Sequence, residues 1–144
     1  METETKPSIS YTGVVLDHNS HVKLLVATAG FHIPFGWKTY AHHMTINMGP
    51  LNEALNPGLI RGAEIKLKAT HVGFDDKVLA VKVHCPMIIT TNKVPHITVA
   101  VNRDGGGKPK HSNDLPEHSW MPLDEEIDLV GVVTVGENPK EPEK

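Results

Sequence analysis

Two short segments of this 144-residue chain share one arrangement of polar and apolar residues. His43-Met44-Thr45-Ile46 and His96-Ile97-Thr98-Val99 both read histidine, apolar, threonine, apolar. Side chains of a strand alternate between its faces, so in extended segments each histidine shares a face with its threonine. The apolar residues on the other face can pack into a core. The pattern therefore predicts a site in which two histidines and two threonines are presented together.

These four side chains suit acid–base chemistry at a phosphorus atom. Imidazole has an ordinary pKa of about 6.5, so one ring can accept a proton from the attacking oxygen while the other protonates the leaving oxygen. The threonine hydroxyls can donate to the non-bridging phosphate oxygens, where charge grows in the transition state. Such a reaction needs no metal ion and no cofactor. The sequence does not decide which histidine is the acid.

Five further residues near the two segments are candidates for substrate binding. Trp37 and Tyr40 precede the first segment, and an aromatic ring at a cleft rim can stack on a nucleobase, although core packing explains them equally well. Lys93 can reach the same phosphate as the second segment, or can be an ordinary solvated lysine. Arg103 and Lys108 flank three consecutive glycines, in a loop that either closes over phosphates or is a mobile surface connection.

The other histidines carry no comparable pattern. Alternation predicts that His42 points away from His43 and has a structural role. His18 and His21 are expected to be exposed on a helix. Because the chain has a single cysteine, Cys85, and no HExxH motif, we predict no metal site.

Strands are the main elements predicted to carry these residues. They are expected at 11–17, 41–49, 63–74, 77–85, 93–102 and 125–135, with 63–85 forming a hairpin. A helix is expected over 18–30, capped by Asp17 or Asn19, with Val22, Leu25, Val26 and Ala29 on one face. The result is an α+β domain with a mostly antiparallel sheet.

Composition limits the remaining choices. A mass of 15.8 kDa predicts one domain, over residues 9–135, with polar flexible tails at 1–8 and 136–144. The formal charge of −3 argues against a protein that binds duplex nucleic acid through a large basic surface. No apolar run is long enough for a membrane span and the N-terminus is no signal peptide, so we expect a soluble cytoplasmic protein.

The paired His-x-Thr segments resemble the signature of the two-histidine (2H) phosphoesterase superfamily. The similarity is greatest to small phage enzymes that destroy cyclic oligonucleotide signals in anti-CBASS defence, and to tRNA-ligase-like 2′,3′-cyclic phosphodiesterases. The resemblance implies two pseudo-symmetric α+β lobes around a central cleft, one of them reduced here because helical content is low. It also implies that His43 and His96 are the catalytic pair and that Thr45 and Thr98 hold the phosphate.

These observations predict a metal-independent phosphodiesterase that cleaves RNA-type phosphodiesters. The shortness and acidic balance of the chain favour cyclic oligonucleotide signals as substrate, in a host cytoplasm if the protein is phage-encoded. A 2′,3′-cyclic phosphodiesterase of RNA-end repair is the alternative with the same chemistry. A non-catalytic nucleotide-binding module and a metal-dependent hydrolase are the rivals from other classes. The oligomeric state is not predicted.

Overall fold

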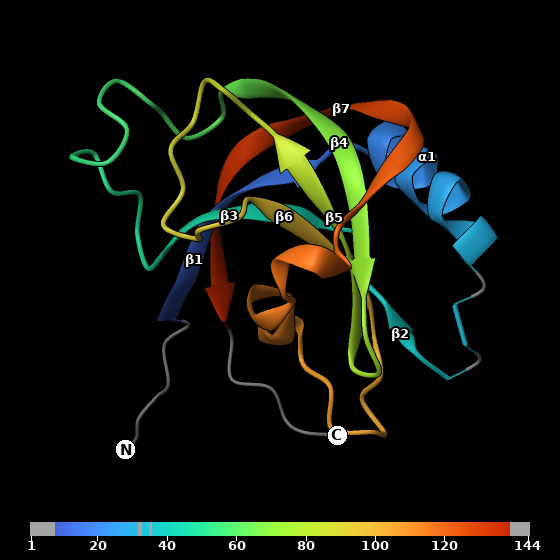
Figure 1. The fold of residues 1–144 in the computed structure, drawn as a ribbon. Coiled ribbons are helices and arrows are strands. Elements are labelled where there is room, and N and C mark those ends of the chain that lie inside the picture. Colours follow the sequence, from blue (N-terminus) through green and yellow to red (C-terminus); the bar gives the residue numbers. More distant parts are fainter. Residues whose placement is uncertain (1–7, 32, 35, 139–144) are drawn as a thin grey trace, which may run out of the picture.

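The computed structural model describes residues 8–31, 33–34 and 36–138, and their strands form one closed antiparallel sheet (Figure 1). The strands of the barrel are β1 (Ser8–Leu16), β3 (His43–Met48), β4 (Glu64–Phe74), β5 (Val78–His84), β6 (His96–Val101) and β7 (Met121–Asn138). They pair in the order β6-β3-β1-β7-β4-β5, and β5 pairs again with β6. The short β2 (Lys38–Thr39) lies beside β6, just before β3 begins.

The core fills the inside of this barrel. Every second residue of a strand points inward, so apolar residues of β1, β3 and β6 meet there. Val14, Met44, Ile46, Ile97 and Val99 are all fully buried. The predicted alternation in the two His-x-Thr segments is therefore confirmed. Its consequence is that both polar pairs lie on the outer face of the barrel.

The helix α1 (His18–Thr28) begins where the sequence predicts, because the Asp17 carboxylate accepts a hydrogen bond of 2.8 Å from the Ser20 amide. The predicted buried face is wrong. Ser20, Leu24 and Thr28 are buried, whereas Val26 is 70% exposed. The Val130 amide of β7 donates to Ser20 Oγ at 2.8 Å, and this contact turns a polar residue toward the sheet. The helix continues into η1 (Ala29–Phe31).

Two 3₁₀ segments cover part of the outer face: η2 (Pro109–Asp114) and η3 (Glu117–Ser119). Leu115 and Trp120 pack there against Ala80 and Val101 in a second, smaller core. The Trp120 ring lies so close to β4 that a Cβ added at Gly73 would be 2.8 Å from it.

Two further expectations concern the outline of the domain. The structure does not show two pseudo-symmetric lobes around a cleft, because all described strands belong to one sheet. Ser8 of β1 pairs with Asn138 of β7, so both strands run into segments predicted as tails. The rest of those tails lies outside the described residues. Within the described ranges, no helix combines the length and apolarity of a membrane span.

Candidate functional site

The two His-x-Thr segments lie side by side on the outer face, on β3 and β6. Met44 pairs with Ile97 in antiparallel register. Extended by one residue each way, this register sets His43 across from Thr98 and Thr45 across from His96. The four outward side chains then form a rectangle with the histidines on one diagonal and the threonines on the other. Diagonal neighbours in a sheet are about 7–8 Å apart, which leaves room for one phosphate between the rings.

This quartet of His43, Thr45, His96 and Thr98 lines a single cavity of about 270 Å³. The cavity is also lined by Tyr11, Tyr40, His42, Asn92, Pro109 and Asn113. Among the described residues, no group of three or more His, Cys, Asp or Glu side chains is placed to hold a metal ion.

The His43 ring is held by strand β1. It stacks on Tyr11 with the ring centroids 4.2 Å apart and the planes 18° from parallel. Gly13 makes this approach possible, since a Cβ there would lie 3.3 Å from His43 Cδ2 and 2.7 Å from the Met44 carbonyl oxygen. Burial, followed by the neighbouring His42 and His96, lowers the pKa of His43 from 6.5 to about 4. His43 is therefore neutral at pH 7.

His96 has different partners. Its ring Nδ1 lies 2.7 Å from the Val94 carbonyl oxygen, which can only accept, so Nδ1 carries a proton and Nε2 is free for chemistry. Burial lowers the pKa of His96, and the hydrogen bond to Val94 opposes that shift. The hydroxyl of the neighbouring Thr98 lies 2.8 Å from Ser112 Oγ in η2. Ser112 is 2% exposed, so this contact fixes Thr98 from the covered side.

Comparison with known proteins shows the family and the fold of the chain. A model of the fungal tRNA ligase phosphodiesterase domain matches residues 7–139. The chain belongs to this family. A structure titled as that of a fungal RNA kinase has the same fold, with a TM-score of 0.59 and 13% identity. The match covers 92% of this chain but 47% of that one. No curated protein is similar enough to count as a relative.

The prediction that His42 points away from His43 and has a structural role is wrong in this member of the phosphodiesterase-domain family. His42 is exposed, lines the cavity, and its ring Nδ1 lies 3.0 Å from Nδ1 of His43. Alternation fails because Ala41 has a positive φ of 50°, which turns the chain just before β3. The Ala41 amide donates to the backbone carbonyl of Thr98 in β6 at 2.9 Å, and the Ala41 carbonyl accepts a 2.8 Å hydrogen bond from the ring of His21. His21 is thus half-buried rather than exposed.

The five predicted substrate-binding residues fall in different places. Tyr40 lines the cavity. Trp37 packs against the main core instead, which is the alternative that the sequence left open. Lys93 is exposed and lies in neighbouring hollows but not in the cavity itself. Arg103 and Lys108 are also exposed and do not line the cavity.

The glycine-rich loop between Arg103 and Lys108 is folded onto the β4–β5 turn. Lys77 Nζ donates to the Gly105 carbonyl at 2.9 Å, and the Asn102 amide side chain donates to the Asp76 carbonyl at 3.0 Å. The amide of Gly107 bonds back to the Asn102 carbonyl at 2.7 Å. These contacts direct the loop away from the quartet, whereas Pro109 and Asn113 of η2, beyond the loop, line the cavity.

Sequence reasoning missed several members of the site. Tyr11 and Gly13 carried a usable signal, because a glycine inside a strand often marks the close approach of another group. Asn92, Asn113 and Ser112 lie in loops and in a 3₁₀ segment, where no periodicity indicates which way a side chain points.

Proposed function

We propose that this chain is a metal-independent phosphodiesterase that opens 2′,3′-cyclic phosphates at RNA ends. The observation that carries the proposal is the quartet: two imidazoles and two hydroxyls facing one cavity from adjacent strands. Membership in the fungal tRNA ligase phosphodiesterase domain family supports this class of substrate.

The reaction is a displacement at phosphorus by water. One imidazole takes a proton from the water as its oxygen attacks, and the second gives a proton to the ribose oxygen that leaves. The ring is opened, a phosphate monoester remains, and the two histidines have exchanged their protonation states. Thr45 and Thr98 donate to the non-bridging oxygens. Thr98 Oγ1 lies 2.8 Å from Ser112 Oγ and donates to the Pro109 carbonyl at 3.4 Å, so with Ser112 as donor to Thr98 the Thr98 hydroxyl hydrogen has to turn from Pro109 to the phosphate.

The hydrogen bonds of the two rings differ, and we use this difference to assign their roles. The carbonyl of Val94 stabilises the charged form of His96, so His96 is the better proton donor. His43, with its pKa lowered to about 4, starts neutral and is the base. His42 contacts Nδ1 of His43, which leaves Nε2 of His43 to face the substrate.

Hydrolysis of cyclic oligonucleotide signals, the first choice from the sequence, uses the same chemistry. Membership in the family does not favour those substrates, so we rank this activity second. A non-catalytic nucleotide-binding module is the third candidate. Binding alone needs no pair of histidines, because arginine or lysine holds phosphate more simply.

One assay separates the three candidates. Wild-type protein is incubated in EDTA with a short RNA ending in a 2′,3′-cyclic phosphate and, separately, with 3′,3′-cGAMP. We expect turnover of the RNA end, and its loss in both His43→Ala and His96→Ala. His18→Ala, which removes an exposed histidine at the start of α1 that does not line the cavity, is the matched control and keeps full activity. Activity on 3′,3′-cGAMP alone would favour the second candidate, binding without turnover the third, and loss of turnover in EDTA would refute the metal-independent mechanism.

A further inference from the structure

Two more hollows neighbour the cavity that is lined by the quartet. One, of about 570 Å³, shares Asn92 and Asn113 with the cavity. The other, of about 580 Å³, shares Lys82, Lys93 and Val94 with the first hollow. We call the two hollows together the basic groove. The three hollows are therefore neighbours, and their shared residues run from two asparagines beside the quartet to two lysines.

The register of the sheet places polar side chains in a row along this path. Lys82 of β5 is the direct cross-strand partner of His96. His71 of β4 is in turn the partner of Lys82. Directly opposed residues on neighbouring strands point to the same face and lie about 5 Å apart. Lys82 is thus one strand away from His96, and His71 is two strands away.

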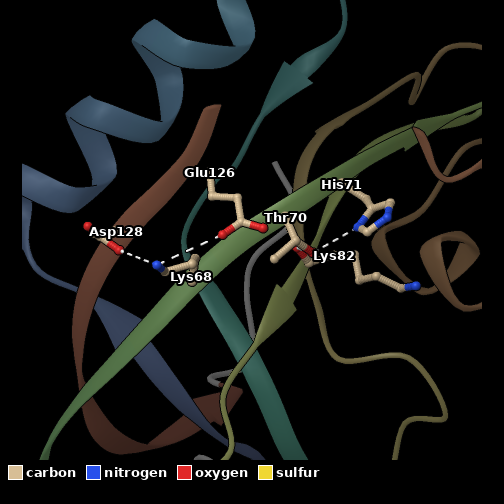
Figure 2. A network of polar contacts seen from close by, with 6 residues as sticks. All are labelled: Lys68, Thr70, His71, Lys82, Glu126 and Asp128. Atoms are coloured by element: carbon tan, nitrogen blue, oxygen red, sulfur yellow. Dashed lines mark hydrogen bonds and ion pairs between the residues drawn. The ribbon is translucent and has the colours of Figure 1, made fainter. Parts of the chain in front are cut away.

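The charges near this row are divided between two groups, as Figure 2 shows. Lys68 lies between the carboxylates of Glu126 and Asp128, at 3.9 and 3.5 Å, so its charge is already matched. Lys82 extends in the opposite direction from that cluster. Within the described part of the chain, neither Lys82 nor Lys93 has a carboxylate within ion-pair distance. The groove is also lined by Glu126, which pairs with Lys68, and by Glu117, so Lys82 and Lys93 are the two lysines of its lining that have no ion pair among the described residues.

His71 adds a fixed donor or acceptor at the far end of the row. Its Nδ1 lies 2.8 Å from Thr70 Oγ1, and the Thr70 hydroxyl is 3.4 Å from the Lys82 carbonyl oxygen (Figure 2). These contacts hold the ring and leave Nε2 as its remaining polar atom.

We propose that the basic groove binds the phosphodiester that precedes the reactive phosphate in an RNA strand, with Lys82 as the main contact and Lys93 beside it. The inference rests on the proposed function, because it takes the quartet as the seat of the reacting phosphate. An RNA strand carries one negative charge per nucleotide, so a chain leaving the quartet along the groove brings its next phosphate to Lys82. The chain is acidic overall, so the two cations Lys82 and Lys93 are what would attract a polyanion to the basic groove.

The test compares two substrates that differ only in the preceding nucleotides. They are a nucleoside 2′,3′-cyclic monophosphate and a trinucleotide with the same cyclic end. We expect Lys82→Ala to lower kcat/KM for the trinucleotide about fivefold, as for one partly exposed ion pair, and to leave the mononucleotide unchanged. Lys82→Arg restores the activity. Arg61→Ala removes one exposed charge outside the groove and changes neither substrate. Equal loss on both substrates, or loss on neither, would overturn the proposal.

A binding measurement keeps this inference separate from the proposed function. Fluorescence anisotropy with a labelled trinucleotide that ends in a stable 3′-phosphate reports on the groove without turnover. The slope of log K against log salt is expected to become shallower by about 0.7 in Lys82→Ala and to stay unchanged in Arg61→Ala. If wild-type protein turns over neither substrate, the proposed function fails, and this salt slope still decides whether the groove binds RNA phosphates. A slope that Lys82→Ala leaves unchanged refutes the groove.

Discussion

The buried, neutral state of His43 predicts a pH-dependent stability that can be measured without any substrate. The pKa of this ring falls from 6.5 to about 4 on folding. Between these values the unfolded chain binds a proton that the folded protein does not, so stability decreases as the pH falls from 6.5 toward 4. Above pH 6.5 the effect is absent.

The size of the effect follows from the two pKa values. Lowering the pH from 7.5 to 5 should cost about 2 kcal/mol of unfolding free energy through His43 alone. His42 and His96 also have lowered pKa values and add to the loss in the same direction. Replacing His43 by a residue that does not titrate removes only the contribution of His43 to this loss of unfolding free energy.

Urea unfolding of the wild type and of His43→Gln at pH 7.5 and pH 5 measures the contribution of His43 to the pH dependence of stability. The quantity of interest is how much stability each protein loses between the two pH values, so a constant destabilisation by the substitution does not matter. We expect the variant to lose about 2 kcal/mol less than the wild type. His18→Gln is the control and should lose as much as the wild type. Equal losses in wild type and His43→Gln would show that the His43 ring is not buried and neutral, and would remove the basis for naming it the base.

Three further predictions concern activity. The profile of kcat/KM against pH should be bell-shaped with an acidic optimum, between about pH 4 and 6.5. The reason is that the proposed base, His43, has a pKa near 4 and the proposed acid, His96, has a pKa lowered from 6.5. An optimum above pH 7 would contradict this assignment of roles. Gly13→Ala should destabilise the protein by about 1–3 kcal/mol and reduce kcat, since the new Cβ would lie 2.7 Å from the Met44 carbonyl oxygen; unchanged thermal unfolding and kinetics would contradict this close approach. His21→Ala should lower kcat more than it raises KM, because it removes the hydrogen bond to the Ala41 carbonyl. His21→Asn, whose side-chain amide can replace the ring Nδ1–H as donor, should recover much of the loss. His18→Ala is the control, and equal activity of the His21→Ala and His21→Asn variants would show that this hydrogen bond has no part in activity.

Alternation was the part of the site that the sequence could predict. In both His-x-Thr segments the apolar residues face the barrel interior, so their burial determines which way the polar residues point. That constraint acts within one strand and can be read locally. The helix start was also readable, because Asp17 caps it through a contact only three residues long.

The parts that sequence analysis missed depend on long-range contacts. His42 faces the cavity because Ala41 adopts a positive φ, and an alanine gives no local sign of that conformation. The exposed Val26 could not be foreseen, since the packing of α1 follows from a hydrogen bond between Ser20 and Val130, 110 residues away. The placement of Lys82 beside His96 likewise depends on how the barrel closes.

The closed sheet also sets limits on how this protein can move during its reaction. The rings of His43 and His96 lie on adjacent strands of one barrel, so no hinge lies between them, and under the proposed function substrate entry need not bring two halves together. Under the proposed function, the spacing of acid and base is then fixed before any ligand binds. On the same proposal, η2 and the loop around Asn92, which also line the cavity, are the segments where substitutions can change ligand selectivity without moving the two histidines.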